Sequence, residues 1–254
     1  MQSFVERARV RVGLSKRELA SLAGVSPSTV GRIEAGTMDP TVTMMQRLIC
    51  AAGAVATVSV TYLSDPAAIA AARAVLDPHS DLIDGPGVPE WIARFSHLGW
   101  LDGQGNAKSP RELAARAARF AALAQRPNIR TFTRNLTWAE CVRRLNESGI
   151  TWAATGATAA NELGVTGDTL WPVFYVSDLD IAARELGLEQ FRPPGTAISL
   201  IPYDGMSERG SRCDDAGNSW AAPLQVLMDC YAGIDRMPDL ADALANRWDA
   251  EAGP

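Results

Sequence analysis

The chain has 254 residues, a formal net charge of −5 and a hydrophobic fraction of 47%, which is ordinary for a globular protein. It shows neither the basic-then-apolar pattern of a signal peptide nor an apolar run approaching the roughly 18 residues of a membrane span. We therefore expect a cytoplasmic protein with no membrane partner.

Cysteine and histidine usage limits the chemistry that the chain offers. Two histidines are present, the four cysteines have no CxxC spacing, and no P-loop, GxGxxG, Ser-His-Asp or Cys-His pattern occurs. We therefore expect no cofactor, no metal site and no catalytic residue, in a protein that is not an enzyme. The cysteines are expected to be buried, reduced thiols; they are Cys50, Cys141, Cys213 and Cys230.

Charge is distributed unevenly along the chain. Residues 1–53 contain seven Lys or Arg and four Asp or Glu, a net charge of +3, which leaves −8 for the remainder. A basic module attracts the phosphates of nucleic acid, whereas an acidic body repels them. The asymmetry favours a DNA-binding head joined to a body that binds something else.

Capping and turn signals predict four helices in the first 53 residues. Ser15 and Glu18 form a capping box, Pro27 follows the N-cap residue Ser26, and Gly24 lies at a turn that favours a positive φ. The predicted helices span residues 3–11, 16–23, 27–35 and about 41–52.

The next part of the chain, residues 54–130, is predicted either to connect the first 53 residues to the rest of the chain or to form a dimer contact. Alternating polar and apolar residues over 54–63 predict a strand, and the Pro and Gly residues within 77–89 predict a linker. Helices are predicted at residues 67–76, 90–101 and 109–125.

From residue 131 the pattern changes to alternating helix and strand, which predicts an α/β or α+β body over residues 131–254. The fold class is thus α/β (α+β), with an all-α domain at residues 1–53. Strands are predicted at 150–154, 173–176 and 197–201, and helices at 137–146, 158–163, 179–186, 223–232 and 240–250.

The segment 14–36 has the pattern of a helix-turn-helix. Leu19, Ala20, Val25, Val30 and Ile33 are spaced to form a small core between two crossed helices, with Ala20 small because the second helix passes close over it. The polar residues between them would then lie on the outer face. A helical hairpin that never touches DNA is the alternative, but such a hairpin would carry apolar residues on that face.

Residues 3–53 resemble the Cro/phage-repressor class of helix-turn-helix proteins, also called XRE-like. The resemblance implies that the second helix enters the major groove, where Arg32 can donate two hydrogen bonds to guanine. Lys16 stands where the family often has glutamine, and Pro27 replaces varied polar residues, so base readout is expected to depend on fewer side chains. The predicted DNA-binding residues are Lys16, Arg17, Ser26, Pro27, Ser28, Thr29 and Arg32.

Residues 135–250 resemble the C-terminal region of AbiEi-type antitoxins, the regulators of type IV toxin–antitoxin systems. The resemblance implies an antitoxin that represses its own operon and is encoded beside a nucleotidyltransferase-like toxin. It is carried by residues 138–156, 159–160, 173–176, 183–188, 198–202 and 223–229.

The same region is also similar to nucleotidyltransferases themselves, which implies a body with a degenerate form of that fold. In those enzymes an Asp-x-Asp pair at the start of a strand holds Mg²⁺. Here Thr155, Gly156 and Ala157 stand at the corresponding turn, and Asp178 and Asp180 supply the acids. Because Asp178 follows the predicted strand 173–176 and precedes the predicted helix 179–186, we expect Asp178 to be an N-cap and Asp180 to interact with the helix dipole.

Two further clusters have a functional and a plain interpretation. Asp214, Asp215 and Asn218 could bind a cation, but a solvated loop is the expected outcome. The arginines at 111, 116 and 119 could contact phosphate, but a solvated charged helix face beside Glu112 is expected.

The leading hypothesis is a sequence-specific repressor of double-stranded DNA, the antitoxin of a toxin–antitoxin pair. Because one small head contacts few bases, we expect a homodimer on a palindromic operator. The alternatives are a metal-dependent nucleotidyltransferase with a DNA-binding head and a one-component regulator whose body binds a small ligand.

Overall fold

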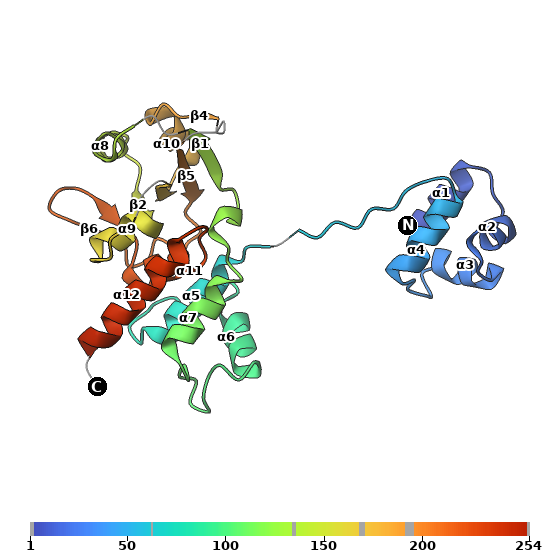
Figure 1. Cartoon of the computed structure of the whole chain (residues 1–254), viewed down its shortest axis with the longest axis horizontal. Coiled ribbons are helices and arrows are strands. Elements are labelled where there is room, and N and C mark those ends of the chain that lie inside the picture. Colours follow the sequence, from blue (N-terminus) through green and yellow to red (C-terminus); the bar gives the residue numbers. More distant parts are fainter. Residues whose placement is uncertain (1–2, 62, 134–135, 168–170, 191–195, 253–254) are drawn as a thin grey trace. The chain divides into compact units, whose positions relative to one another are not determined.

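The computed structural model describes residues 3–61, 63–133, 136–167, 171–190 and 196–252. The chain divides into two compact units, Met1–Thr61 and Tyr62–Pro254, which we call the head and the body. In Figure 1 the head is the blue group of helices, and the body runs from cyan to red. Within the described residues, no helix is both long and apolar enough to cross a membrane.

The head contains the four helices that the capping signals predict. They are α1 (Phe4–Arg11), α2 (Lys16–Ala23), α3 (Pro27–Glu34) and α4 (Val42–Ala51). Ser15 and Glu18 form the predicted capping box, with Glu18 N donating to Ser15 Oγ over 3.2 Å and Ser15 N donating to Glu18 Oε2 over 2.7 Å. The apolar sides of the helices share one core, made of Val5, Leu19, Ala20, Ala23, Val30, Ile33, Leu48, Ile49 and Ala52.

The strand predicted over residues 54–63 is wrong. Residues 54–61 have no regular secondary structure, and position 62 lies outside the described residues. An alternating pattern becomes a strand only when a neighbouring strand pairs with its backbone and one face is buried. Val55 is 90% exposed, Val60 is 77% exposed and Leu63 is 85% exposed, so neither condition is met here.

The first part of the body is helical and contributes directly to its core. Helices α5 (Pro66–Leu76), α6 (Val88–His97) and α7 (Pro110–Ala118) precede the short 3-10 helix η1 (Leu123–Gln125). Residues 67–72 of α5 are apolar and all buried, and Arg73 is buried beside them with its guanidinium donating to the carbonyl oxygens of Met206 and Arg209. The linker predicted over 77–89 is wrong, because Leu82 and Val88 are fully buried in the same core.

A mixed seven-stranded sheet forms the other part of the body, with strand order β4-β1-β5-β3-β2-β7-β6. The β5–β3 and β2–β7 pairs are parallel, and the remaining pairs are antiparallel. The strands are β1 (Arg130–Thr133), β2 (Trp152–Thr155), β3 (Val173–Val176), β4 (Glu189–Gln190), β5 (Ala197–Pro202), β6 (Arg212–Cys213) and β7 (Ser219–Trp220). Strand β3 has the predicted bounds, whereas β1, β4, β6 and β7 were not predicted because they are short or polar.

Five helices accompany the sheet. They are α8 (Trp138–Glu147), α9 (Gly156–Glu162), α10 (Leu179–Glu185), α11 (Pro223–Tyr231) and α12 (Met237–Ala252). Helix α11 packs against α9 and α12 and also against α5 and α7 (Figure 1). One hydrophobic core therefore includes residues of both the 54–130 and the 131–254 regions.

The cysteines differ from one another in exposure. Cys141 and Cys230 are buried, as expected, whereas Cys50 and Cys213 are exposed. The expectation of buried thiols is therefore wrong for two of them. Cys50 lies on the outer side of α4, and Cys213 lies on β6 at the edge of the sheet, where neighbours cover only one side.

Candidate nucleic-acid interface

The N-terminal end of α3 is capped by a side chain and otherwise open to solvent. Ser26 Oγ accepts a hydrogen bond from Thr29 N over 3.1 Å, and Pro27 occupies the first helical turn. The same hydroxyl lies 2.8 Å from Ser28 Oγ and 2.8 Å from Thr29 Oγ1. A helix N-terminus carries a partial positive charge, so this cluster of hydroxyls lies where a phosphate or a base edge is attracted.

The turn between α2 and α3 fixes the position of that helix end. Gly24 ends α2 in the left-handed conformation, with φ +64°, which glycine adopts without strain. Val25 N then donates to Ala20 O over 2.9 Å. Arg47 of α4 donates to the carbonyl oxygens of Ala23 and Gly24, so the turn is also held by α4.

A buried carboxylate ties three helices of the head together. Glu34 at the end of α3 accepts from Arg9 Nε of α1 over 2.7 Å, and its second oxygen lies 3.3 Å from Lys16 Nζ of α2. The Glu34 side chain is only 3% exposed. Burial alone would raise the pKa of Glu34, but the hydrogen bonds from Arg9 and Lys16 hold the pKa below its ordinary value.

The predicted DNA-binding residues all lie at the outside of the α2–α3 pair. Lys16, Arg17, Ser26, Pro27, Ser28 and Arg32 are exposed and Thr29 is half-buried, while Val30 and Ile33 of the same helix are in the core. Among the described residues, the Arg32 guanidinium has a single hydrogen-bond partner, the thioether of Met38, with 3.0 Å between Nη2 and Sδ. A thioether is a weak acceptor, so the Arg32 guanidinium is available for a stronger partner.

Lys16 has a second role that the sequence did not indicate. Its ammonium group pairs with Glu34 while its side chain stays 51% exposed. A phosphate contact by Lys16 would therefore compete with, or extend, an ion pair that also stabilises the head. Arg9 and Glu34 were not predicted, because the two are 25 residues apart and belong to helices that meet only in the fold.

A comparison with protein families bears on this arrangement. Residues 5–57 match a family model described as helix-turn-helix. Residues 5–57 are an XRE-family helix-turn-helix domain. The match confirms the predicted domain and indicates a DNA-binding transcriptional regulator. Neither a curated protein nor a solved structure matches the chain.

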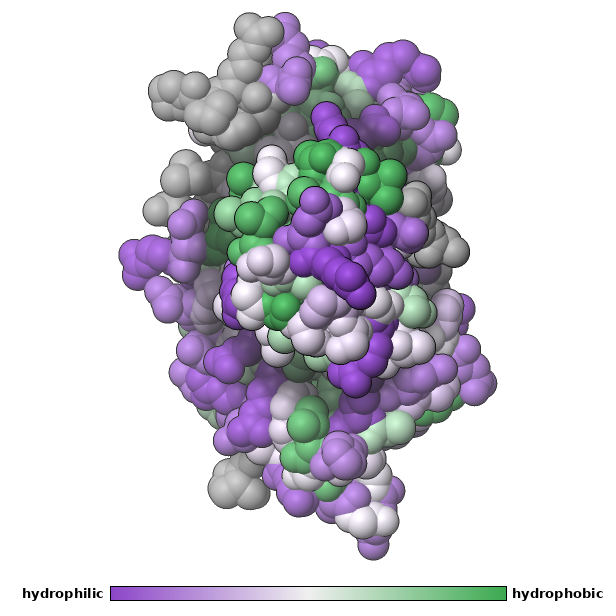
Figure 2. All heavy atoms as spheres, turned by 90° about the vertical axis from the view of Figure 1, so that its right-hand side faces the viewer, coloured by the Kyte–Doolittle hydropathy of each residue, from purple (hydrophilic) through white to green (hydrophobic). Residues whose placement is uncertain are grey.

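The surface of the helix-turn-helix domain is not uniformly polar. Phe4 is 72% exposed, Leu22 is 63% exposed and Val42 is 56% exposed. Figure 2 draws all heavy atoms of the chain, with the head and the body together, and shows green hydrophobic areas beside purple hydrophilic ones on the face that is drawn. Single exposed apolar residues of this kind are normal on the surface of a folded domain.

The two acids of the possible nucleotidyltransferase site have other partners. Asp178 is the N-cap of α10, and its Oδ1 accepts from Ile181 N over 2.8 Å, which confirms the predicted cap. Asp180 lies in the first turn of that helix and pairs with Arg130 over 2.7 Å. Among the described residues, no three side chains of His, Cys, Asp or Glu come together as a metal site would require.

The Asp214 loop is organised by its own carboxylate. Asp214 Oδ1 accepts from the backbone of Ala216 and Asn218, and Oδ2 accepts from Asn218 Nδ2 and from Trp220 Nε1. Hydrogen bonds from the Asn218 and Trp220 side chains lower the pKa of Asp214. Both oxygens are therefore committed to shaping the turn between β6 and β7.

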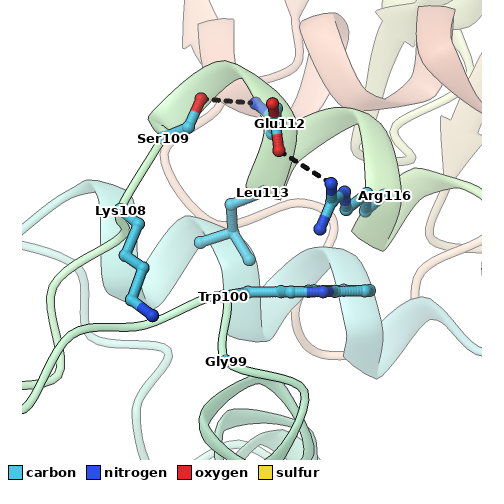
Figure 3. A pocket seen from close by; sticks show the side chains of 7 residues that line it. All are labelled: Gly99, Trp100, Lys108, Ser109, Glu112, Leu113 and Arg116. Carbon is cyan, nitrogen blue, oxygen red and sulfur yellow. Dashed lines mark hydrogen bonds and ion pairs between the residues drawn. The ribbon is translucent and has the colours of Figure 1, made fainter.

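Two of the three arginines predicted to form a charged face, Arg111 and Arg116, are in ion pairs within the body, and Arg119 is exposed directly after α7. Arg116 pairs with Glu112 one turn away over 2.8 Å and lies over the Trp100 ring, 5.2 Å from its centroid (Figure 3). Arg111 pairs with Asp242 over 2.7 Å. Arg116, Glu112 and Trp100 line a cavity of about 110 Å³. The Arg116–Glu112 and Arg111–Asp242 ion pairs both support the predicted charged helix face.

A buried polar network in the body was not predicted. Asp229 of α11 accepts from Thr155 Oγ1 over 2.6 Å and from Tyr175 OH over 2.9 Å, both through Oδ2. Gln225, one turn earlier, donates to Asp229 Oδ1 over 3.0 Å and accepts from Arg73 over 2.9 Å. The available signal was the i, i+4 spacing of Gln225 and Asp229 on an otherwise apolar helix.

Proposed function

We propose that the chain is a sequence-specific transcriptional repressor that binds an operator at its own promoter. The observation that carries the proposal is the N-terminal end of α3, where a capped helix presents Ser28, Thr29 and Arg32 outward while Val30 and Ile33 anchor it. Such a helix fits the major groove, where hydroxyls and a guanidinium distinguish base pairs.

The test is a fluorescence-anisotropy titration of the full chain with its own upstream DNA and with a scrambled duplex, at two salt concentrations. We expect Arg32→Ala to lose about 1–3 kcal/mol of the preference for the specific duplex. Arg212→Ala is the control, because it removes the same charge from an exposed site on β6 of the body. Equal binding to both duplexes, erased by salt, would show that the head does not recognise this sequence.

We also propose that the repressor binds as a homodimer. One α2–α3 pair contacts few bases, so two heads on a palindrome, about one helical turn apart, would supply the specificity. The exposed Phe4, Leu22 and Val42 supply apolar surface that a second copy could cover. Sedimentation with and without a palindromic duplex tests this, and a strictly monomeric chain that saturates one half-site without cooperativity would contradict it.

We further infer that the body gives the chain the role of an antitoxin in a type IV-like system, with a nucleotidyltransferase-like toxin as its partner. The resemblance of residues 135–250 to AbiEi-type antitoxins supports this. The experiment is expression of the neighbouring gene with and without the chain. Relief of growth arrest by both wild type and Arg32→Ala would support neutralisation by the body, whereas no relief by either would contradict it.

Within this proposal the chain regulates and does not transfer nucleotides itself. The capping role of Asp178 and the Arg130–Asp180 pair favour structural functions for the two acids. Incubation with labelled nucleotide, Mg²⁺ and tRNA tests the alternative. Label transfer that Asp178→Ala abolishes would establish an enzyme.

A further inference from the structure

The segment that links α4 to α5 is held at both ends and unpaired between them. At its start, Ala56 is half-buried against the core of the head. At its end, Ser64 Oγ donates to Ala122 O over 2.9 Å. Among the described residues, no backbone hydrogen bond involves positions 57–61, and all five of these residues are exposed. Their N–H and C=O groups are therefore free to pair with another strand.

The composition of this segment is that of a strand and not that of a flexible linker. Flexible linkers are rich in Gly, Ser, Pro or charged residues. Between Gly53 and Asp65 the chain has no Gly, Pro or charged residue, and five of the eight residues at 54–61 are β-branched. Val58 is 60% exposed and Val60 is 77% exposed. Residues of this kind suit a strand whose side chains pack against those of a neighbour.

The order of the residues shows which neighbour fits. The sequence Thr57-Val58-Ser59-Val60-Thr61 reads the same in both directions. In an antiparallel pair of two copies centred on Ser59, each Val58 lies opposite Val60 of the other copy. Each Thr57 likewise lies opposite Thr61. Valine thus faces valine and threonine faces threonine, which are favourable cross-strand pairs.

Charge and connectivity also favour a second copy of this chain. The nearest charged residues in the sequence are Arg47 and Asp65, so no like charges meet when the segment pairs with itself. Antiparallel pairing joins the two heads to opposite ends of a ribbon about 17 Å long, since a strand rises about 3.4 Å per residue. A twofold axis through Ser59 then relates the heads, as the two half-sites of a palindrome require.

We propose that residues 57–61 of two copies pair as an antiparallel β-ribbon and form the contact of the homodimer. The inference rests on the proposed homodimer and assigns to it a contact surface outside the helices of the head. In a single chain the segment has no regular structure, because its partner strand belongs to the second copy. An isolated pair of strands is only marginally stable, so operator DNA that holds two heads together should strengthen the pairing.

The experiment is disulfide trapping of the full-length chain without DNA, in a glutathione redox buffer and at several protein concentrations. The parent protein carries Cys50→Ser and Cys213→Ser, which remove the two exposed thiols. Ser59→Cys in this parent places the new thiol on the twofold axis, next to its own copy. We expect its disulfide dimer to form at least about tenfold faster than that of Thr57→Cys.

Thr57→Cys is the matched control. Thr57 is also exposed and lies on the same face of the proposed strand, but the two Thr57 positions of a dimer are about 14 Å apart. A disulfide needs Cα atoms within about 7 Å, so the ordered ribbon does not allow this bond. The double variant Thr57→Cys/Thr61→Cys brings thiols opposite each other again and should recover fast trapping.

A pair of charge variants tests the register independently, each combined with Ser59→Cys. Val58→Glu/Val60→Glu places like charges opposite each other across the ribbon, whereas Val58→Glu/Val60→Lys places opposite charges there. We expect trapping to slow in the first variant and to persist in the second. Equal slowing in both would contradict the register.

The outcomes separate this contact from the proposed function. Fast trapping of Ser59→Cys with slow trapping of Thr57→Cys supports the ribbon. Equal rates, which random collisions of a flexible segment would give, or no trapping at all, overturn it. If trapping fails while the chain binds a palindromic duplex cooperatively, the homodimer stands and this contact is wrong. Fast trapping in a chain that does not prefer its operator supports the ribbon and contradicts the repressor.

Discussion

Arg126 donates from Nη2 to Asp229 Oδ1 over 2.7 Å, and both side chains are at most 1% exposed. Arg126 follows η1, whereas Asp229 lies on α11 and also accepts from Thr155 at the end of β2 and from Tyr175 on β3. Burial raises the pKa of Tyr175, so its phenol keeps the proton that it donates. One carboxylate thus connects the helical part of the body to its sheet.

We predict that Asp229→Asn destabilises the body by about 3–5 kcal/mol, because it leaves the Arg126 charge buried without its counter-charge. Urea denaturation followed by tryptophan fluorescence measures this, since all seven tryptophans belong to the body. Asp180→Asn is the control: Asp180 pairs with Arg130 at the same 2.7 Å, but its side chain is 82% exposed. Equal shifts of the two urea midpoints would contradict the prediction.

Local signals account for most of the elements that the sequence predicted. The caps Ser15 and Ser26 act on residues within three positions, so α2 and α3 begin where predicted. Strand β3 is a continuous buried run between its neighbours, and its bounds were also predicted correctly. Residues 54–61 have the alternating pattern of a strand but no partner strand in the structure. The sequence shows the pattern and does not show that the partner is missing.

The polar interactions within the head and within the body join residues that are far apart in the sequence, so they depend on the fold. Thr155, Tyr175 and Arg126 are 74, 54 and 103 residues away from Asp229. Glu34 and Arg9 meet across 25 residues. Nothing in the periodicity of these segments indicates such pairings. The exposed residues of α3, in contrast, were predictable because they alternate with core residues on one helix.

Two glycines of the helix-turn-helix domain should respond oppositely to alanine. Gly24→Ala places a Cβ at φ +64° and 3.1 Å from Arg47 Nη2, so we expect a loss of about 1 kcal/mol. Gly31 lies within α3, and a Cβ added there would meet no atom within 4 Å, so Gly31→Ala should stabilise the helix by about 0.5–1 kcal/mol. Hydrogen exchange of the α2 and α3 amides in the full chain measures both. Faster exchange in Gly31→Ala than in Gly24→Ala would refute this assignment.

The Glu34 cluster should make the stability of the domain dependent on pH. A carboxylate whose folded pKa is lowered contributes stability above its unfolded value, here 4.5, and loses it as the pH falls through the folded value. We therefore expect the urea concentration at the unfolding midpoint of the head to fall when the pH is lowered below about 4.5. NMR of the head amides in the full chain measures this midpoint. Glu34→Gln should lower the midpoint at neutral pH and flatten this dependence. Asp39→Asn, which alters an exposed acid of the same domain, should leave the dependence in place.

The thiols should separate into two classes of reactivity. Cys50 and Cys213 are exposed, so a disulfide reagent such as DTNB should modify them rapidly in the native chain. Cys141 and Cys230 are buried, and burial also raises the pKa of Cys230, which disfavours its reactive thiolate. We expect two fast equivalents in the folded protein and four in denaturant.

The Cys50→Ser variant is the control for this prediction. Its fast class should fall to one equivalent, which should be Cys213, because Cys213 is the other exposed thiol and lies on the edge strand β6. If Cys230 reacted as fast as Cys213, then α11 would have to open readily, and the Asp229 network could not be the rigid connection between helices and sheet that its four hydrogen bonds imply.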